Sequence, residues 1–154
     1  MWYRALFLSL SLVACHAVVA GDAPLRITDA WVREAPPSQE VRAAYMRIDN
    51  DAPDPRRITG ASSSEFRSVE IHRTVIQNGL ARMVAQPEIL IPAHGEVVLK
   101  PGGYHLMLIG PLKPLRSGDR VTIRLQLGTE VQQTIEAQVR QGDGPVADHE
   151  HHHH

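Results

Sequence analysis

The stretch Asp119-Arg-Val-Thr-Ile-Arg-Leu-Gln-Leu127 has the most regular pattern in the chain and indicates its fold class. Its aliphatic residues alternate with polar ones, and they are Val121, Ile123, Leu125 and Leu127. Successive side chains of a β-strand point to opposite faces, so the alternation predicts a strand with one face in the core and one in water. No segment of ten or more residues carries a helical period. The sequence therefore favours an all-β fold.

Similar short segments, separated by turn-forming residues, occur along most of the chain. Asn78-Gly79 is the strongest hairpin signal, because both residues tolerate positive φ. The predicted strands cover residues 25–33, 41–48, 57–61, 68–72, 80–84, 104–109, 119–127 and 130–139, and apolar stretches also flank the turn at His94-Gly95. In the first strand the alternation puts Ile27 and Trp31 on one face, and Met46 of the second strand is predicted to lie in the core. Eight or nine strands at this spacing predict an antiparallel Greek-key β-sandwich.

Composition and charge argue against several classes of function. The formal net charge is −1, with basic and acidic residues interspersed, which gives no indication of binding to nucleic acid or to an anionic membrane surface. The chain has no Ser-His-Asp order, paired-carboxylate site or phosphate-binding glycine loop that stands out. We therefore do not expect an enzyme.

The N-terminal segment is typical of a secretory signal. Arg4 precedes the apolar run 5–14, which is too short to span a bilayer. Two processing routes are open: cleavage after Val18-Val19-Ala20, or lipidation of Cys15 in the lipobox-like Leu12-Val13-Ala14-Cys15. Both place the protein outside the cytoplasm, soluble in the first case and lipid-anchored in the second. We predict a signal segment at 1–20 and one folded domain at 21–140.

The C-terminal segment, residues 141–154, has no core-forming residues and is expected to be disordered. It ends in a cluster of imidazoles, formed by His149, His151, His152, His153 and His154. If the segment is native, this cluster is a metal-capturing tail. The alternative is a truncated purification tag.

Four residues between positions 72 and 107 form the candidate metal site. His105 and Met107 are two residues apart on a predicted strand, so both side chains leave one face about 6.5–7 Å apart. His72 and Met83 flank the predicted hairpin and can lie near each other. For either sulfur alone, a core methionine is the simpler interpretation. The spacing of all four residues is what supports a site.

Two imidazoles and two thioethers suit a soft monovalent ion. Thioether sulfur selects Cu(I) in preference to Zn(II). The single cysteine, Cys15, lies outside the predicted domain, so the domain cannot form a blue-copper electron-transfer site. Neutral, weakly held ligands allow the ion to be passed on by ligand exchange. Glu70 faces the same side as His72 and either orients it or is an ordinary surface carboxylate; His94 is expected to be solvated.

The spacing His72, ten residues, Met83, twenty-one residues, His105-Leu-Met107 resembles the H-x10-M-x21-H-x-M copper motif of the periplasmic PCuAC copper chaperones. The resemblance covers roughly residues 25–140 and includes Asp29-Ala-Trp31, Ala43-Ala-Tyr45, Val69-Glu-Ile-His72, Asn78-Gly79, Ile91-Pro-Ala93 and Leu99-Lys-Pro-Gly-Gly-Tyr-His105. It implies a cupredoxin-like β-sandwich that binds Cu(I) through His72, Met83, His105 and Met107. Relatives often carry an additional Met soon after the first motif His, and residues 73–76 contain none.

The same resemblance implies a function and partners. Members of the family are associated with delivering copper to the CuA centre of cytochrome c oxidase, on subunit II, alongside Sco-type thiol proteins. Some have His- and Met-rich C-terminal extensions that bind Cu(II), and the resemblance implies the same role for the imidazoles of residues 149–154. Other interpretations remain: a copper-scavenging or tolerance protein, a metal-free sandwich that binds other proteins, or a copper redox enzyme, which would need an open coordination position and a substrate pocket that the sequence does not indicate.

Overall fold

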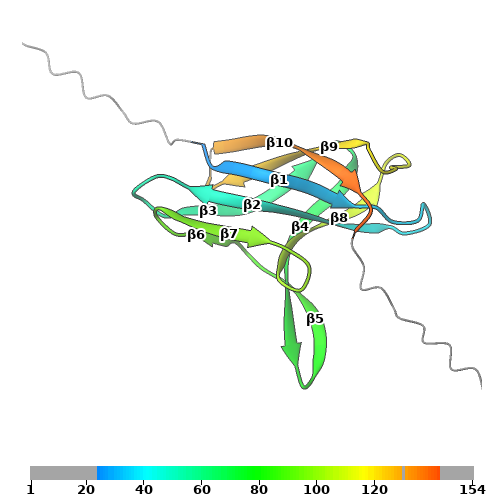
Figure 1. Ribbon diagram of the computed structural model, residues 1–154, viewed down its shortest axis with the longest axis horizontal. Helices are drawn as coiled ribbons and strands as arrows, with labels where there is room; N and C mark the ends of the chain where they lie inside the picture. Colours follow the sequence, from blue (N-terminus) through cyan, green and yellow to red (C-terminus); the bar gives the residue numbers. More distant parts are fainter. Residues whose placement is uncertain (1–23, 130, 143–154) are drawn as a thin grey trace, which may run out of the picture.

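Ten β-strands and no helix make up the described part of this computed structural model, residues 24–129 and 131–142 (Figure 1). The strands are β1 (Arg26–Arg33), β2 (Val41–Asn50), β3 (Arg56–Ser63), β4 (Phe66–Gln77), β5 (Leu80–Ala85), β6 (Ile89–Ile91), β7 (Gly95–Leu99), β8 (Tyr104–Pro111), β9 (Arg120–Leu127) and β10 (Val131–Arg140). The all-β prediction is confirmed. The short strands β6 and β7 are additional to the eight predicted ranges, and β3 continues to Ser63, two residues beyond its predicted end.

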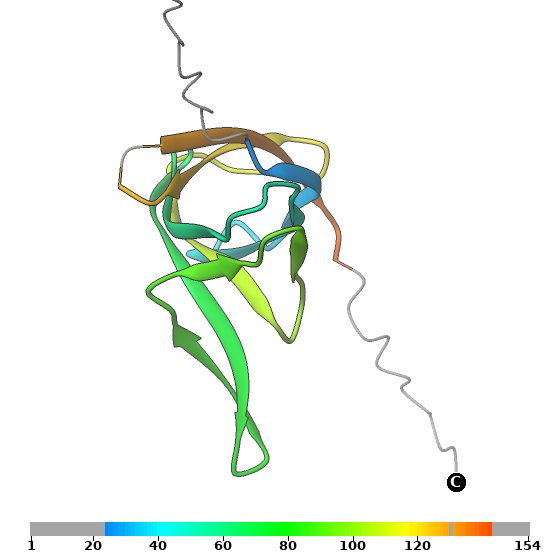
Figure 2. The ribbon, with the colours of Figure 1, turned by 90° about the vertical axis from the view of Figure 1, so that its left-hand side faces the viewer.

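The strands pair into one barrel-like sheet instead of two separate layers. The order β4-β8-β2-β1-β10-β9-β3 is closed by a pairing of β3 with β4, at Ala61 and Val69, and Figure 2 looks into the barrel. Neighbouring strands are antiparallel except β1 and β10, which run parallel with Trp31 opposite Gln138. The prediction of a wholly antiparallel arrangement is wrong at this pair. Alternation defines the two faces of a strand but not its partners, and here the two ends of the chain supply neighbouring strands.

The core fills the inside of the barrel. Val121, Ile123 and Leu125 of β9 have no exposed surface, as their alternation predicts, and Leu106 and Leu108 of β8 are equally buried. Burying a side chain of this size stabilises the fold by roughly 1.5–3 kcal/mol. The same inward-facing pattern turns the alternate residues of β8 outward, so the strands that build the core also present side chains on the barrel's outer face.

A bulge in β1 turns Trp31 to this outer face. Asp29 has a φ of 49°, and the register with β2 shifts between Thr28 and Trp31. The extra residue switches the faces of the strand beyond it. Before the bulge, Ile27 packs against the core; after it, the buried residue is Val32, so Trp31 points outward. The prediction that Ile27 and Trp31 share a face is therefore wrong.

The hairpin of β4 and β5 projects from the barrel (Figures 1 and 2). Asn78 and Gly79 turn the chain with φ values of 53° and 76°, as the hairpin signal predicts. The pairing of β4 with β8 ends at Arg73 opposite Tyr104, and beyond that point β4 pairs only with β5. All six residues of β5 are exposed. We call residues 74–85 the arm.

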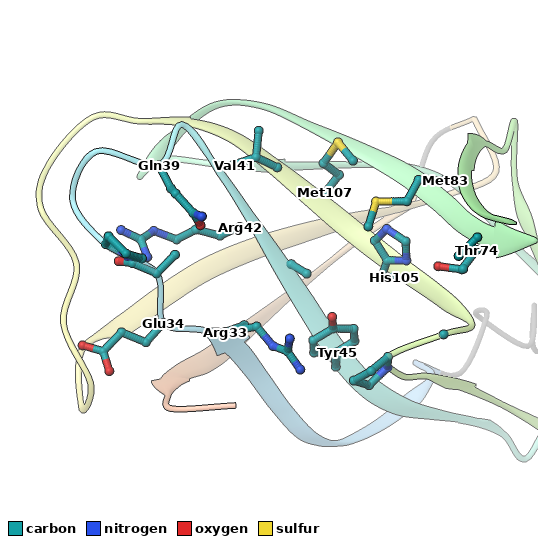
Figure 3. Close-up of a pocket in the computed structure, with 16 residues that line it drawn as sticks. Arg33, Glu34, Gln39, Val41, Arg42, Tyr45, Thr74, Met83, His105 and Met107 are labelled. Carbon is teal, nitrogen blue, oxygen red and sulfur yellow. The ribbon is translucent and has the colours of Figure 1, made fainter. Parts of the chain in front are cut away.

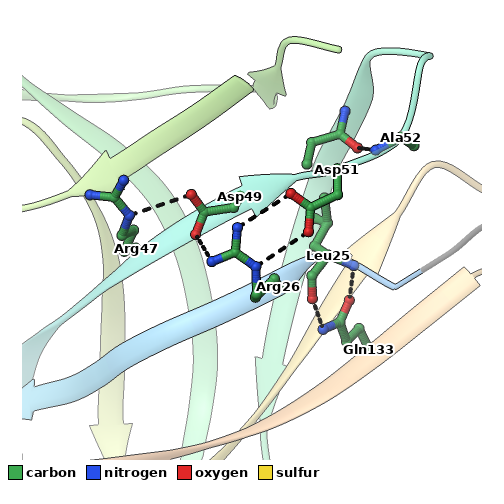
Figure 4. Close-up of polar contacts among 8 residues, drawn as sticks. Leu25, Arg26, Arg47, Asp49, Asp51, Ala52 and Gln133 are labelled. Atoms are coloured by element: carbon green, nitrogen blue, oxygen red, sulfur yellow. Dashed lines mark hydrogen bonds and ion pairs between the residues drawn. The ribbon is translucent and has the colours of Figure 1, made fainter. Parts of the chain in front are cut away.

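A network of polar contacts secures the beginning of β1 (Figure 4). Arg26 lies 3.3 Å from the buried carboxylate of Asp49 and also donates to Asp51. The hydrogen bond from Arg26, together with its charge, lowers the pKa of Asp51. Leu25 donates its N–H to the side chain of Gln133 and accepts a hydrogen bond from it in return. These contacts fix one end of β1, and its other end leads to the candidate site.

Candidate metal centre

The four predicted ligands lie on one outer face formed by β4, β5 and β8. His72 on β4 is directly opposite His105 on β8, and their ring centroids are 5.9 Å apart. Met107 follows two residues later on β8, opposite Glu70. Met83 comes from β5, opposite Thr74, which shares the face of His72. Strand pairing thus brings both imidazoles and one thioether together, and the arm contributes the second sulfur.

A cavity of about 520 Å³ adjoins this group of side chains. Met83, Met107 and His105 gather at one end of it (Figure 3). Met83 is 63% exposed, whereas His72 and His105 are 9% and 3% exposed. The imidazoles are therefore fixed in the wall of the barrel, and the sulfur on the arm is the most accessible of the four.

His72 is held by Glu70. Its Nε2 lies 2.8 Å from the Glu70 carboxylate, which can only accept, so a neutral His72 carries its proton on Nε2 and keeps the lone pair on Nδ1. That Nδ1 atom is buried and has no hydrogen-bond partner among the described residues. Glu70, although half exposed, thus contacts His72 as the orienting interpretation predicts.

His105 has the complementary arrangement. Its Nδ1 donates to the carbonyl oxygen of Gly103 at 3.1 Å, which leaves the lone pair on Nε2. Nε2 is buried and also lacks a partner in the described part of the chain. Burial lowers the pKa of His105 below its ordinary value of 6.5, and nearby His72 lowers it further, although the bond to Gly103 acts in the opposite direction. The ring is therefore neutral at neutral pH, which is the form that binds metals.

The donor set fits a soft metal ion. Two buried imidazole nitrogens without a partner among the described residues are costly, and coordination of a metal would satisfy both. The hydrogen bonds on the opposite ring nitrogens are those that usually orient metal-binding histidines. With thioethers as the remaining donors, the set suits Cu(I) better than Zn(II).

An aromatic pair extends the site toward β1. Tyr45 is buried, its ring centroid lies 6.5 Å from that of His105, and its ring contacts that of Trp31 in a tilted arrangement, with centroids 4.7 Å apart. Burial raises the pKa of Tyr45, and the charge of Arg33 opposes this. In the sequence, Tyr45 stands out only as part of the Ala43-Ala-Tyr45 resemblance, without a role of its own. Its alternation with Met46, which is buried as predicted, could have placed it on the outer face.

Several predicted features lie outside the described residues. These are the signal segment, Cys15 and the imidazoles at His149, His151, His152, His153 and His154. His94 is exposed in its turn, with a φ of 49°. Within residues 24–129 and 131–142, no helix is long and apolar enough to cross a membrane.

Comparison with known proteins identifies relatives of this chain. The family model described as "Putative lipoprotein LpqE-like" matches residues 25–139. "Putative lipoprotein Lxx21020" of Leifsonia xyli subsp. xyli is 31% identical, over 79% of this chain and 76% of its own length. The uncharacterized protein RP573 of Rickettsia prowazekii is 26% identical, over 79% and 70%.

Solved structures share the fold. The copper-bound PCuAC domain from PmoF2 matches with a TM-score of 0.66 and 25% identity, covering 79% of this chain and 97% of that domain. The solution structure of CuI-DR1885 from Deinococcus radiodurans matches with a TM-score of 0.65 and 31% identity, covering 80% and 83%. The apo PCuAC domain from PmoF1 has a TM-score of 0.66 at 20% identity, which shows likeness of fold alone.

Proposed function

This chain belongs to the LpqE-like family and to the PCuAC-type copper chaperones that its structural matches represent, and on that premise we propose that it carries copper. It binds one Cu(I) ion through His72, Met83, His105 and Met107 and passes the ion to another protein. The observation that carries the proposal is the pair of buried imidazoles, each with one nitrogen hydrogen-bonded and the other without a partner among the described residues, beside two thioethers.

The ligand set suits carriage of copper better than catalysis. All four donors are neutral, so the ion is held without charge neutralisation and can leave by stepwise exchange of ligands. The two imidazoles are fixed in the barrel wall, whereas Met83 stands on the exposed arm. We infer that an incoming ligand displaces Met83 first, while His72 and His105 keep hold of the ion until the transfer is complete.

The partners and compartment follow from family resemblance. The proposed recipient is the CuA centre on subunit II of cytochrome c oxidase, with Sco-type proteins acting alongside. The proposed location is the periplasm, and the lipoprotein names of the family and of its relative support an anchor at Cys15 over a soluble form. Intact-mass analysis of the membrane fraction tests this point, because an acylated Cys15 adds the mass of its lipid, and a Cys15→Ala variant would lose it.

Titration of the exported protein with Cu(I), in competition with a chromogenic chelator, tests the function. One equivalent of Cu(I) should bind, and X-ray absorption should detect sulfur ligands. Met107→Leu should weaken binding sharply, since leucine keeps the volume but has no donor atom. Stoichiometric binding without any sulfur scattering, or a Met107→Leu variant with wild-type affinity, would show that the ligand assignment is wrong.

A further inference from the structure

The end of the cavity away from the two methionines is cationic. Arg33 and Arg42 both line it (Figure 3). No carboxylate within residues 24–129 and 131–142 forms an ion pair with either of them. The chain as a whole carries a formal charge of −1, so two unpaired arginines at one cavity depart from its general balance.

Arg42 is the more unusual of the two, since it is only 3% exposed. One guanidinium nitrogen donates to the backbone carbonyl of Ala35 at 2.7 Å, while its buried Nε has no partner among the described residues. A buried guanidinium without a carboxylate is unfavourable, because the lost hydration of the charge is only partly replaced. Arg42 lies on the face of β2 that carries Ala44 and Met46, so it adds positive charge beside the cavity, while Arg33 is the guanidinium that lies over Tyr45.

Arg33 is held in position by its neighbours. Its guanidinium carbon lies 5.9 Å from the centre of the Tyr45 ring, within the range of a cation–π contact. Gly142 approaches so closely that a Cβ built there would meet Arg33 Nε at 2.6 Å. Tyr45 in turn adjoins His105, and Figure 3 shows Arg33 turned toward Tyr45. A ligand bound at Arg33 would therefore lie across Tyr45 from the metal ligands.

The acidic residue that lines the cavity does not neutralise these arginines. Glu34 is part of the lining, but its carboxylate accepts a hydrogen bond from the backbone N–H of Ser117 at 3.1 Å. Guanidinium groups bind carboxylates through paired hydrogen bonds, which gives both strength and orientation. The cavity thus offers a carboxylate site at one end and sulfur ligands at the other.

We propose that this cavity docks an acidic segment of the protein that exchanges copper with this chain. A carboxylate of the segment binds Arg33, and a sulfur side chain of the same segment reaches Met83 and Met107. An extended segment advances about 3.3 Å per residue and alternates its side chains between two faces, so an acid and a sulfur residue four positions apart share a face and are separated by about 13 Å. The role of the sulfur rests on the proposed copper function, but docking of the carboxylate does not.

The test is an NMR titration of the metal-free exported protein with a blocked hexapeptide that contains one Asp and one Met four positions apart. Amide shifts should cluster at cavity-lining residues, among them Ala43, Tyr45 and Ala81. A matched peptide with Asn in place of Asp should bind about tenfold more weakly, because a charge-assisted hydrogen-bonded pair is lost.

Variants assign the effect to the cavity. Arg33→Gln should weaken binding of the Asp peptide about tenfold and remove the preference over the Asn peptide, while Arg33→Lys should restore part of it. Arg124→Gln, at an exposed position of β9, removes the same charge outside the cavity and should change nothing. Chelator competition should give the same Cu(I) affinity for all of these proteins.

Three outcomes would overturn the proposal. The first two are equal binding of the Asp and Asn peptides and amide shifts that lie outside the cavity. The third is peptide binding only after deletion of residues 143–154, which would show that the chain's own C-terminal segment takes the place of the partner. Failure of Cu(I) to bind is a separate result. It would refute the copper function but leave the dependence on Asp and Arg33 measurable, so the two failures can be told apart.

Discussion

Glu70 offers the sharpest test of how the imidazoles are arranged. Its carboxylate holds His72 Nε2 at 2.8 Å and thereby leaves Nδ1 as the donor atom. Replacing Glu70 with Gln keeps the shape and an acceptor oxygen but removes the charge, and replacing it with Ala removes the contact altogether. If Nδ1 is the ligand, both changes loosen the orientation and lower the basicity of the ring, so Cu(I) affinity falls.

The expected loss of Cu(I) affinity follows from the contact between Glu70 and His72 and from the exposure of Glu70. Removing the hydrogen-bond partner of a metal-binding histidine typically lowers metal affinity about 10- to 100-fold, or about 1.4–2.7 kcal/mol. The Glu70 side chain is 51% exposed, so solvent screens its charge. We therefore expect about a tenfold loss for Glu70→Gln and a larger loss, up to about a hundredfold, for Glu70→Ala. The fold should lose less than about 1 kcal/mol, because exposed ion pairs contribute little.

Chelator competition for Cu(I), with thermal unfolding of the apo proteins, measures both quantities. Glu136→Gln is a matched control, since Glu136 is an exposed carboxylate that accepts a hydrogen bond from Thr122 on another part of the barrel. The sign of the result matters. If Nε2 were the copper ligand, the metal would have to displace Glu70, and its removal would strengthen binding. Unchanged or tighter binding by the Glu70 variants would therefore refute the assignment of Nδ1.

Three further predictions address the other parts of the site. Met83→Leu should lower Cu(I) affinity at least about tenfold, but it should change the unfolding free energy by less than about 0.5 kcal/mol because the side chain is 63% exposed. Its control, Met46→Leu in the core, should lower the unfolding free energy by up to about 1.5 kcal/mol and leave copper binding intact. The pKa of His105 is lowered in the folded state, so the unfolded chain binds the proton more readily, and the urea midpoint of the apo protein should fall as the pH drops below about 6.5. His105→Gln should flatten this dependence and His94→Asn should not; a wild-type midpoint that is constant from pH 7.5 to 5.5 would contradict the account. Deletion of residues 149–154 should abolish Cu(II) binding, followed by electron paramagnetic resonance, and preserve Cu(I) binding; loss of both ions would show that the tail and the core site are one unit.

The sequence predicts those parts of the site that depend on strand parity. Alternation along 104–109 puts His105 and Met107 on the face opposite Leu106 and Leu108, and the structure has this arrangement. Asn78-Gly79 forms the predicted turn, because its two residues readily adopt positive φ.

Other features cannot be predicted from the sequence, because they depend on contacts between distant segments or on irregularities within a single strand. The positive φ of Asp29 reverses the parity of β1 and brings Trp31 onto Tyr45, and a single aspartate in a regular alternation does not reveal a bulge. The parallel pairing of β1 with β10 joins opposite ends of the chain, which no local pattern encodes. Likewise, the unpaired state of Arg42 becomes visible only when its surroundings are known.

The parallel pairing of β1 and β10 also gives the domain a polarity. Because both strands run the same way, the described chain enters the barrel at Leu25 and leaves at Gly142 from the opposite end, beside Arg33 (Figure 1). A tether attached upstream of Leu25 would therefore hold the barrel with its methionines directed away from the point of attachment. A circularly permuted version would need a linker as long as β1, about 26 Å for its eight residues. The parallel direction of β1 and β10 thus determines which end of the domain faces outward when the protein is attached to a surface through its N-terminal side.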